Sequence, residues 1–175
     1  REATELVLQK KGSGRLYYRV GVSLVPKVET LPPENHGFTV ERRYRGLDNS
    51  GDVTQNDQGD WQIKAGARVE VELTLAAPEE RHHVALIDLL PSGLEASEPL
   101  KIASDTGWRS WHEHENLRDD RVEVFASLLK PGVYSYKYVA LATTPGDFVL
   151  PPAKAEEMYS PETSGRSESA RLTIR

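Results

Sequence analysis

Cysteine is absent from the 175 residues, which excludes disulfide bonds, thiolate catalysis and cysteine-ligated metals. The sequence also has no apolar run long enough for a membrane helix and no basic start followed by an apolar segment. We therefore expect neither direct membrane insertion nor a signal peptide within it. Blocks of like charge are missing too, because acidic and basic residues are mixed along the length, with a formal net charge of -5. This mixture argues against a nucleic-acid-binding surface.

Sustained helical periodicity is also lacking, so we expect at most one short helix. Alternation with period two is common instead, and it is clearest over 68–77, where apolar residues from Val69 to Ala77 share one face. Residues 116–129 could form a helical face, but their alternation, a β-branched start and the turn at residues 130–132 into the next strand favour a hairpin. The predicted strands cover 15–25, 38–45, 61–63, 68–77, 84–90, 116–129, 133–142, 148–150 and 170–174.

One strand, following the turn at Pro131 and Gly132, carries the most specific pattern. It opens Gly-x-Tyr-x-Tyr, with Tyr134 and Tyr136 two positions apart. Immunoglobulin-like sandwiches use such a pair near their next-to-last long strand: the first tyrosine bonds back to the backbone and the second enters the core. We therefore expect an all-β, immunoglobulin-like antiparallel sandwich.

The remaining segments read as long loops. Residues 26–37 contain three prolines, residues 46–60 are polar without periodicity, and residues 94–110 also look loop-like. Residues 153–165 form an acidic, proline-bounded tail. Because the chain begins with Arg1 rather than Met, we expect residues 1–175 to be a single domain of a much larger protein.

Candidate chemistry is sparse. If the chain is extended at 111–115, His112 and His114 share one face and could offer two imidazoles to zinc, but nothing in the sequence brings a third ligand near them. No Gly-x-Ser-x-Gly motif is present. Three tryptophans could form a sugar-stacking platform, although core packing is the simpler interpretation. We therefore predict no catalytic residues, no enzyme activity, no metal and no cofactor.

Several ordered segments resemble the C-terminal macroglobulin-like (MG10, receptor-binding-like) domain of bacterial α2-macroglobulins. The likeness spans nearly the whole chain, from the Gly-Ser-Gly-Arg-Leu-Tyr-Tyr run to the Met-Tyr-x-Pro run near its end. The segments that carry it are residues 12–21, 38–44, 83–95, 116–122, 142–146, 151–162 and 165–167.

The resemblance implies a non-enzymatic module of a macroglobulin-type protease trap in the cell envelope or outside the cell. Its partners would be neighbouring domains of the parent chain, and target proteases through the whole parent. In such traps a protease cuts a bait segment and the molecule rearranges around it. The terminal sandwich packs beside the thioester domain and moves with it. The cysteine of a thioester would lie in another domain.

An interface that releases on activation should be moderate in area and mixed in polarity. Met158 and Tyr159 are apolar residues within the acidic tail, so we hypothesise that they dock on a neighbouring domain; the alternative is that they cap this sandwich. The other interface candidates are Pro161, Trp108 and Trp111. Two rival functions remain open: a repeat of a surface adhesin or stalk, and a zinc- or carbohydrate-binding module.

Overall fold

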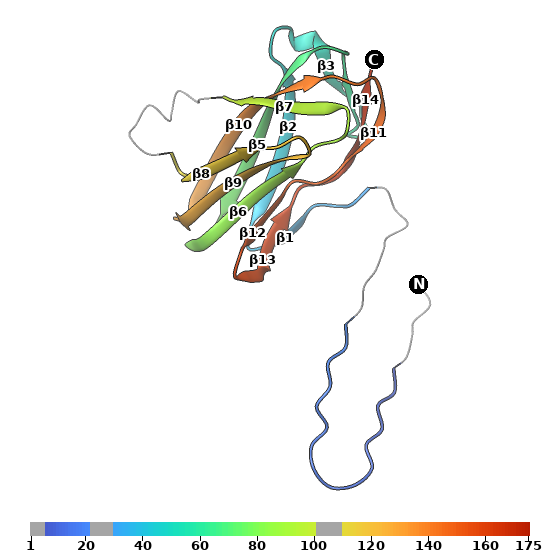
Figure 1. The fold of residues 1–175 in the computed structure, drawn as a ribbon, viewed down its shortest axis with the longest axis vertical. Coiled ribbons are helices and arrows are strands. Elements are labelled where there is room, and N and C mark those ends of the chain that lie inside the picture. The colour runs from blue at the N-terminus through green and yellow to red at the C-terminus, as the bar shows by residue number, and fades with distance from the viewer. Residues whose placement is uncertain (1–5, 22–29, 101–109) are drawn as a thin grey trace.

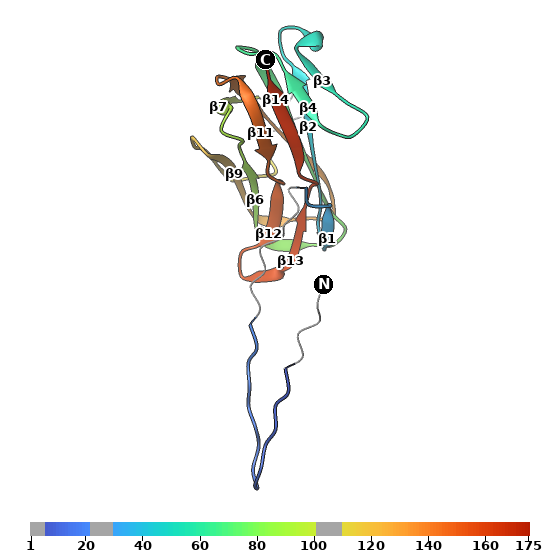
Figure 2. The same cartoon turned by 90° about the vertical axis from the view of Figure 1, so that its right-hand side faces the viewer.

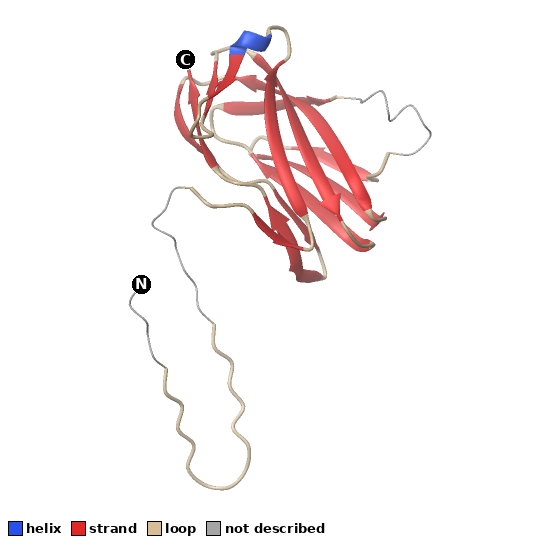
Figure 3. Ribbon diagram, turned by 180° about the vertical axis from the view of Figure 1, so that it is seen from behind, coloured by secondary structure: helices blue, strands red, loops and turns tan. Residues whose placement is uncertain are grey.

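The computed structural model describes residues 6–21, 30–100 and 110–175. Its strands form three sheets around a common core (Figures 1 and 3). Sheet A has the order β1 (Glu34–His36), β13 (Ser160–Arg166), β12 (Lys154–Glu157), β6 (Arg81–Leu89), β9 (Arg121–Leu129) and β8 (His114–Leu117). Sheet B has the order β2 (Thr39–Gly46), β5 (Arg68–Ala77), β10 (Gly132–Ala142) and β7 (Leu94–Pro99). Sheet C has the order β11 (Gly146–Leu150), β14 (Ala170–Ile174), β4 (Trp61–Ile63) and β3 (Val53–Gln55).

Sheets A and B supply the two faces of the core. Along β5 every second side chain is apolar and buried, because the period of a strand sends alternate residues to the same face. Leu73 of β5 and Tyr138 of β10 are fully buried, as are Leu86 of β6 and Val124 of β9. All four belong to one apolar cluster, which makes the two sheets a sandwich.

Sheet C continues the sandwich at one end. The chain passes from β11 into β12 through residues 151–153 and from β13 into β14 through residues 167–169, so strands of sheet C lead directly into sheet A (Figure 2). Pro151 and Pro152 interrupt the first passage because proline cannot donate to a β ladder. The pairing of β14 with β4 is parallel, whereas the other strand pairs in the described residues are antiparallel.

The predicted fold class is confirmed: the described chain is an antiparallel β-sandwich with one short 3-10 helix, Ser50–Asp52. Strand rather than helix is confirmed over most of residues 116–129, where β8 pairs with β9. The hairpin expected across the turn at residues 130–132 is wrong, because β9 lies in sheet A and β10 in sheet B, so the turn crosses between the two sheets. Within the described ranges, no helix has the length and apolar character needed to cross a bilayer.

The strand predicted over residues 15–25 is wrong for the part that the structure describes. Residues 15–21 are extended but lie in no strand, and Tyr17 and Tyr18 are exposed. The alternation of apolar residues was real, yet no neighbouring strand within the described residues pairs with it. A segment with strand-like alternation but no neighbouring strand has backbone N–H and C=O groups that hydrogen-bond to water instead.

Two predicted irregular segments are partly strands. Leu94–Pro99 forms β7 on the edge of sheet B, where it pairs with β10. The expected tail contains β12 and β13, which pair with each other and join β6 to β1. Both segments contain Pro and Glu, which strands disfavour by propensity, so backbone pairing outweighed composition.

Candidate functional site

A charged cluster lies between the two sheets. Arg42 of β2 donates to Asp88 of β6 over 2.5 Å and to the carbonyl of Pro151 over 2.6 Å, and the Tyr138 hydroxyl of β10 donates to the second Asp88 oxygen over 2.7 Å. The Arg42 side chain is 3% exposed and that of Asp88 0%. Water and substrates therefore have no access to this pair, which makes it a structural link between the sheets.

Burial and charge act together on this cluster. Burial alone would lower the pKa of Arg42, but the Asp88 carboxylate beside it raises that pKa above its ordinary value. The pKa of Tyr138 is raised well above its usual range, first by burial and then by the charge of Asp88. The guanidinium therefore stays charged and the phenol stays neutral at physiological pH, as the observed hydrogen bonds require.

The turn between β12 and β13 presents Met158 and Tyr159 to solvent. Their exposed fractions are 50% and 79%. The turn is fastened to β6, because the Met158 amide donates to the carbonyl of His83 over 2.9 Å and the Glu157 carboxylate accepts from the amide of His82 over 3.0 Å. The two apolar side chains are thus held on a fixed support at one end of the sandwich.

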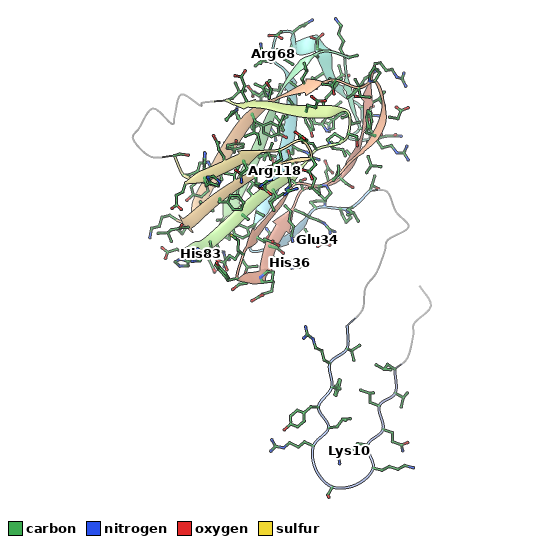
Figure 4. All side chains as sticks on the ribbon, in the orientation of Figure 1. Lys10, Glu34, His36, Arg68, His83 and Arg118 are labelled. Carbon is green, nitrogen blue, oxygen red and sulfur yellow. The ribbon has the colours of Figure 1, made fainter. Side chains whose placement is uncertain are left out.

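His83 contributes to the same surface. Its ring meets Tyr159 edge-on with the centroids 5.2 Å apart, and its φ is +50°, a left-handed conformation unusual for a residue with a Cβ. Pro161 follows on β13 and is exposed. Figure 4 places His83 at the end of the sandwich where His36 also lies. We name the surface formed by His83, Met158, Tyr159 and Pro161 the hairpin-end patch.

The tryptophan candidates are placed differently. Trp111 lies against sheet B: its indole N–H donates to the carbonyl of Ser135 over 2.9 Å, and its ring centroid lies 5.5 Å from that of Tyr134. It packs partly buried on the core of this sandwich. Trp108 lies outside the described residues.

The turn into β10 has its own anchor. The Tyr134 hydroxyl donates over 2.6 Å to the carbonyl of Lys130, which precedes Pro131 and Gly132. Tyr136 is 4% exposed and points into the core. This bond spans the turn between β9 and β10 and fixes the entry of the longest strand of sheet B.

The two histidines considered for zinc are held by other contacts. His112 lies 2.7 Å from the hydroxyl of Ser110 and 3.3 Å from a carboxylate oxygen of Glu115. His114 stacks on Phe125, with the ring centroids 6.1 Å apart. Across residues 6–21, 30–100 and 110–175, no group of three or more His, Asp or Glu side chains is arranged to hold a metal ion.

A second charged cluster lies on the outer face of sheet A. The Glu123 carboxylate accepts from Arg121 over 2.5 Å and from Arg118 and Asn116 over 3.2 Å each. The hydrogen bond from Arg121 is the main reason that the pKa of Glu123 lies below its ordinary value. Arg121 also pairs with Asp120. These charges neutralise one another and leave no unpaired acid or base for catalysis.

The buried pair was missed by sequence analysis, although one signal was present. Arg42 shares a strand face with Val40 and Tyr44, which are core residues. A charged side chain at such a position requires an opposite charge nearby. The sequence does not show which acidic residue supplies it, because Asp88 lies on the opposite sheet.

Comparison with known proteins connects this geometry to a family. Residues 37–162 match the family model described as the bacterial alpha-2-macroglobulin MG10 domain. The chain is 32% identical to part of the circularly permutated Ras protein 2 of Dictyostelium discoideum, over 98% of this chain and 4% of that protein. It is 29% identical to an alpha-2-macroglobulin homolog of a Nostoc species, over 97% of this chain and 9% of that protein.

A solved structure has the same fold. The crystal structure of a Salmonella alpha-2-macroglobulin mutant matches with a TM-score of 0.68 and 25% identity, over 82% of this chain and 10% of that one. The chain thus spans a tenth or less of the length of these relatives. Since the family model covers most of the sandwich, the chain belongs to the family of the bacterial alpha-2-macroglobulin MG10 domain.

Proposed function

We propose that this chain is a non-catalytic domain of an alpha-2-macroglobulin-like protease inhibitor located in the cell envelope or secreted. In this proposal it packs beside the thioester-type domain of its parent and moves with it when a protease triggers rearrangement. Membership of the MG10 family supports the proposal, as do relatives that are named alpha-2-macroglobulins and are much longer than this chain.

The observation that carries the proposal is the hairpin-end patch. Met158 and Tyr159 are large apolar side chains exposed side by side on a turn that is bonded to β6. Burying such a side chain against another domain contributes about 1.5–3 kcal/mol. Two of them give a contact that is specific and small enough to separate, as a rearranging molecule requires.

The connection between the two sheets of the sandwich suits this role. The Arg42–Asp88 pair ties sheet A to sheet B, and the β12–β13 hairpin lies within sheet A. When a neighbouring domain displaces the hairpin-end patch, the whole sandwich therefore moves with it as one body.

No observation in the described residues favours an adhesin repeat or a zinc- or carbohydrate-binding module.

The test is the double substitution Met158→Ala/Tyr159→Ala in the full-length parent, with Val133→Ala as the matched control. Val133 is also exposed, at 72%, but it lies on β10 of sheet B, whereas the patch lies on sheet A. We expect the double variant to lose protease trapping or to rearrange without protease, and the control to behave as wild type. If the double variant traps protease and rearranges as the wild type does, the proposal is wrong.

A further inference from the structure

The hairpin-end patch contains the sulfur of this chain. The sequence has no cysteine and one methionine, and that methionine is Met158. Thiolates and thioethers are the side-chain groups that stand on the ladder of biological sulfur oxidation. A peroxide therefore meets one sulfur atom in these 175 residues, and that atom lies in the surface to which we assign the docking contact.

The Met158 side chain is accessible to solvent in the described structure. It is 50% exposed, and Tyr159 beside it is 79% exposed. Its thioether thus lies outside the buried core of the sandwich. A small reagent in water reaches it without any opening of the fold, and accessibility is a main determinant of how fast a side-chain sulfur is oxidised.

The fold around Met158 does not depend on its thioether. The backbone amide of Met158 donates to the carbonyl of His83 over 2.9 Å, and the Glu157 carboxylate accepts from the amide of His82 over 3.0 Å. Glu157 also pairs with Ser160 in the β12–β13 ladder. A chemical change at the end of the Met158 side chain therefore alters the surface of the patch and leaves the support of the turn in place.

Oxidation of a thioether by hydrogen peroxide transfers two electrons. The sulfur lone pair attacks one peroxide oxygen, an S=O bond forms and the O–O bond breaks. The departing hydroxide takes the proton of the transferred oxygen and leaves as water. Sulfur is thereby oxidised and peroxide is reduced, and a flexible apolar side chain becomes a polar sulfoxide that accepts hydrogen bonds.

A sulfoxide does not suit the apolar contact assigned to Met158. In that contact the side chain leaves water and packs against another domain, and a polar S=O group buried there needs a hydrogen-bond donor. The backbone amides of Met158 and His82 already donate to other acceptors. Neither amide is therefore free to compensate the sulfoxide.

We propose that Met158 is a peroxide-sensitive modification site whose sulfoxide prevents the hairpin-end patch from docking. The inference deepens the proposed function and rests on it, because docking is the step that the sulfoxide blocks. A docked domain covers the thioether, so oxidation follows release and keeps the released patch from docking again. A methionine sulfoxide reductase reverses the modification.

The 175-residue chain tests the site itself. Trypsin cleaves after Lys154 and Arg166, so the peptide 155–166 carries Met158 and reports its oxidation by mass. In hydrogen peroxide, Met158 of the folded chain should be oxidised within about 10-fold of the rate in the synthetic peptide 155–166, because its thioether is accessible. The melting temperature of the oxidised chain should stay within about 5 °C of the untreated value. A slower rate or a larger drop in melting temperature would overturn the inference.

Two substitutions in the full-length parent test the effect on docking. Met158→Gln replaces the thioether by a polar group of similar length, whereas Met158→Leu, the matched control, keeps an apolar side chain of similar volume. The Gln variant should lose protease trapping or rearrange without protease, and the Leu variant should behave as wild type. If the Gln variant behaves as wild type, or if the two variants behave alike, the inference is wrong.

The rate of oxidation in the parent separates this inference from the proposed function. Hydrogen peroxide should oxidise Met158 at least about 10-fold more slowly in the untriggered parent than in the 175-residue chain, because the neighbouring domain covers it. Equal rates would refute the proposed docking and this inference with it. Slow oxidation in a parent whose Met158→Gln variant traps normally would refute the redox inference alone.

Discussion

Arg42 and Asp88 are both removed from water, and each compensates the other's charge across the two sheets. Burying one of them alone would cost several kcal/mol, because an unpaired charge loses its hydration without gaining a partner. Tyr138 and the Pro151 carbonyl complete the hydrogen bonding of the pair. The stability of the sandwich therefore depends more on the match between these two residues than on either side chain by itself.

Arg42→Met should accordingly destabilise the domain by about 3–5 kcal/mol, because it leaves the Asp88 carboxylate buried without its cation. The double variant Arg42→Met/Asp88→Leu removes both charges and should be more stable than the single variant. Urea unfolding curves of the two variants and wild type provide the measurement. A double variant that is less stable than the single variant would contradict this account.

At the scale of the strand, close backbone contact replaces side-chain packing where β13 meets the start of β2. Gly165 of β13 pairs with Ala155 of β12 and Asn35 of β1. A Cβ built on Gly165 would lie 2.1 Å from the carbonyl oxygen of Phe38. The strands can lie in this arrangement because residue 165 has no side chain.

Gly165→Ala should therefore destabilise the domain by about 1–3 kcal/mol, since backbone must shift to admit the methyl group. Gly51→Ala is the matched control, because the nearest atom to its added Cβ is 3.5 Å away, an ordinary contact. Thermal unfolding followed by circular dichroism compares the two. Equal melting temperatures for the two variants would show that the β13–β2 contact tolerates a side chain.

Strands with an apolar face were predictable, and strands of mixed composition were not. β5 and β10 alternate apolar residues over ten and eleven residues, so their period is visible in the sequence. β12 and β13 are held by neighbours on both sides, and their Ser and Glu residues conceal the pattern. Met158 and Tyr159 stand out in the sequence because they differ from the polar residues around them, and their role at an interface stays a prediction. The hydrogen bonds that hold their turn come from β6 and could not be read from the sequence.

For the whole molecule, residues 6–21 and the sandwich are predicted to be energetically independent. Deleting residues 1–21 should leave the melting temperature of the remaining chain within about 2 °C of its original value, because the side chains of residues 6–21 are exposed in the described structure. Calorimetry of both chains measures this. A drop of about 5 °C or more would mean that the N-terminal segment contributes to the sandwich core.

The connectivity of the sheets governs how the domain reaches its native state. β1 pairs with β13, and β4 pairs with β14, so early strands depend on partners from the end of the chain. Contacts between residues so distant in sequence must be formed after a large loss of chain entropy, which slows the folding of all-β domains to about milliseconds to seconds. A ribosome that has released only the first half of this domain presents β2 and β5 without the last strands of sheets A and C. The sandwich can close only when its C-terminal strands become available, so its folding is a late event in the synthesis of this segment.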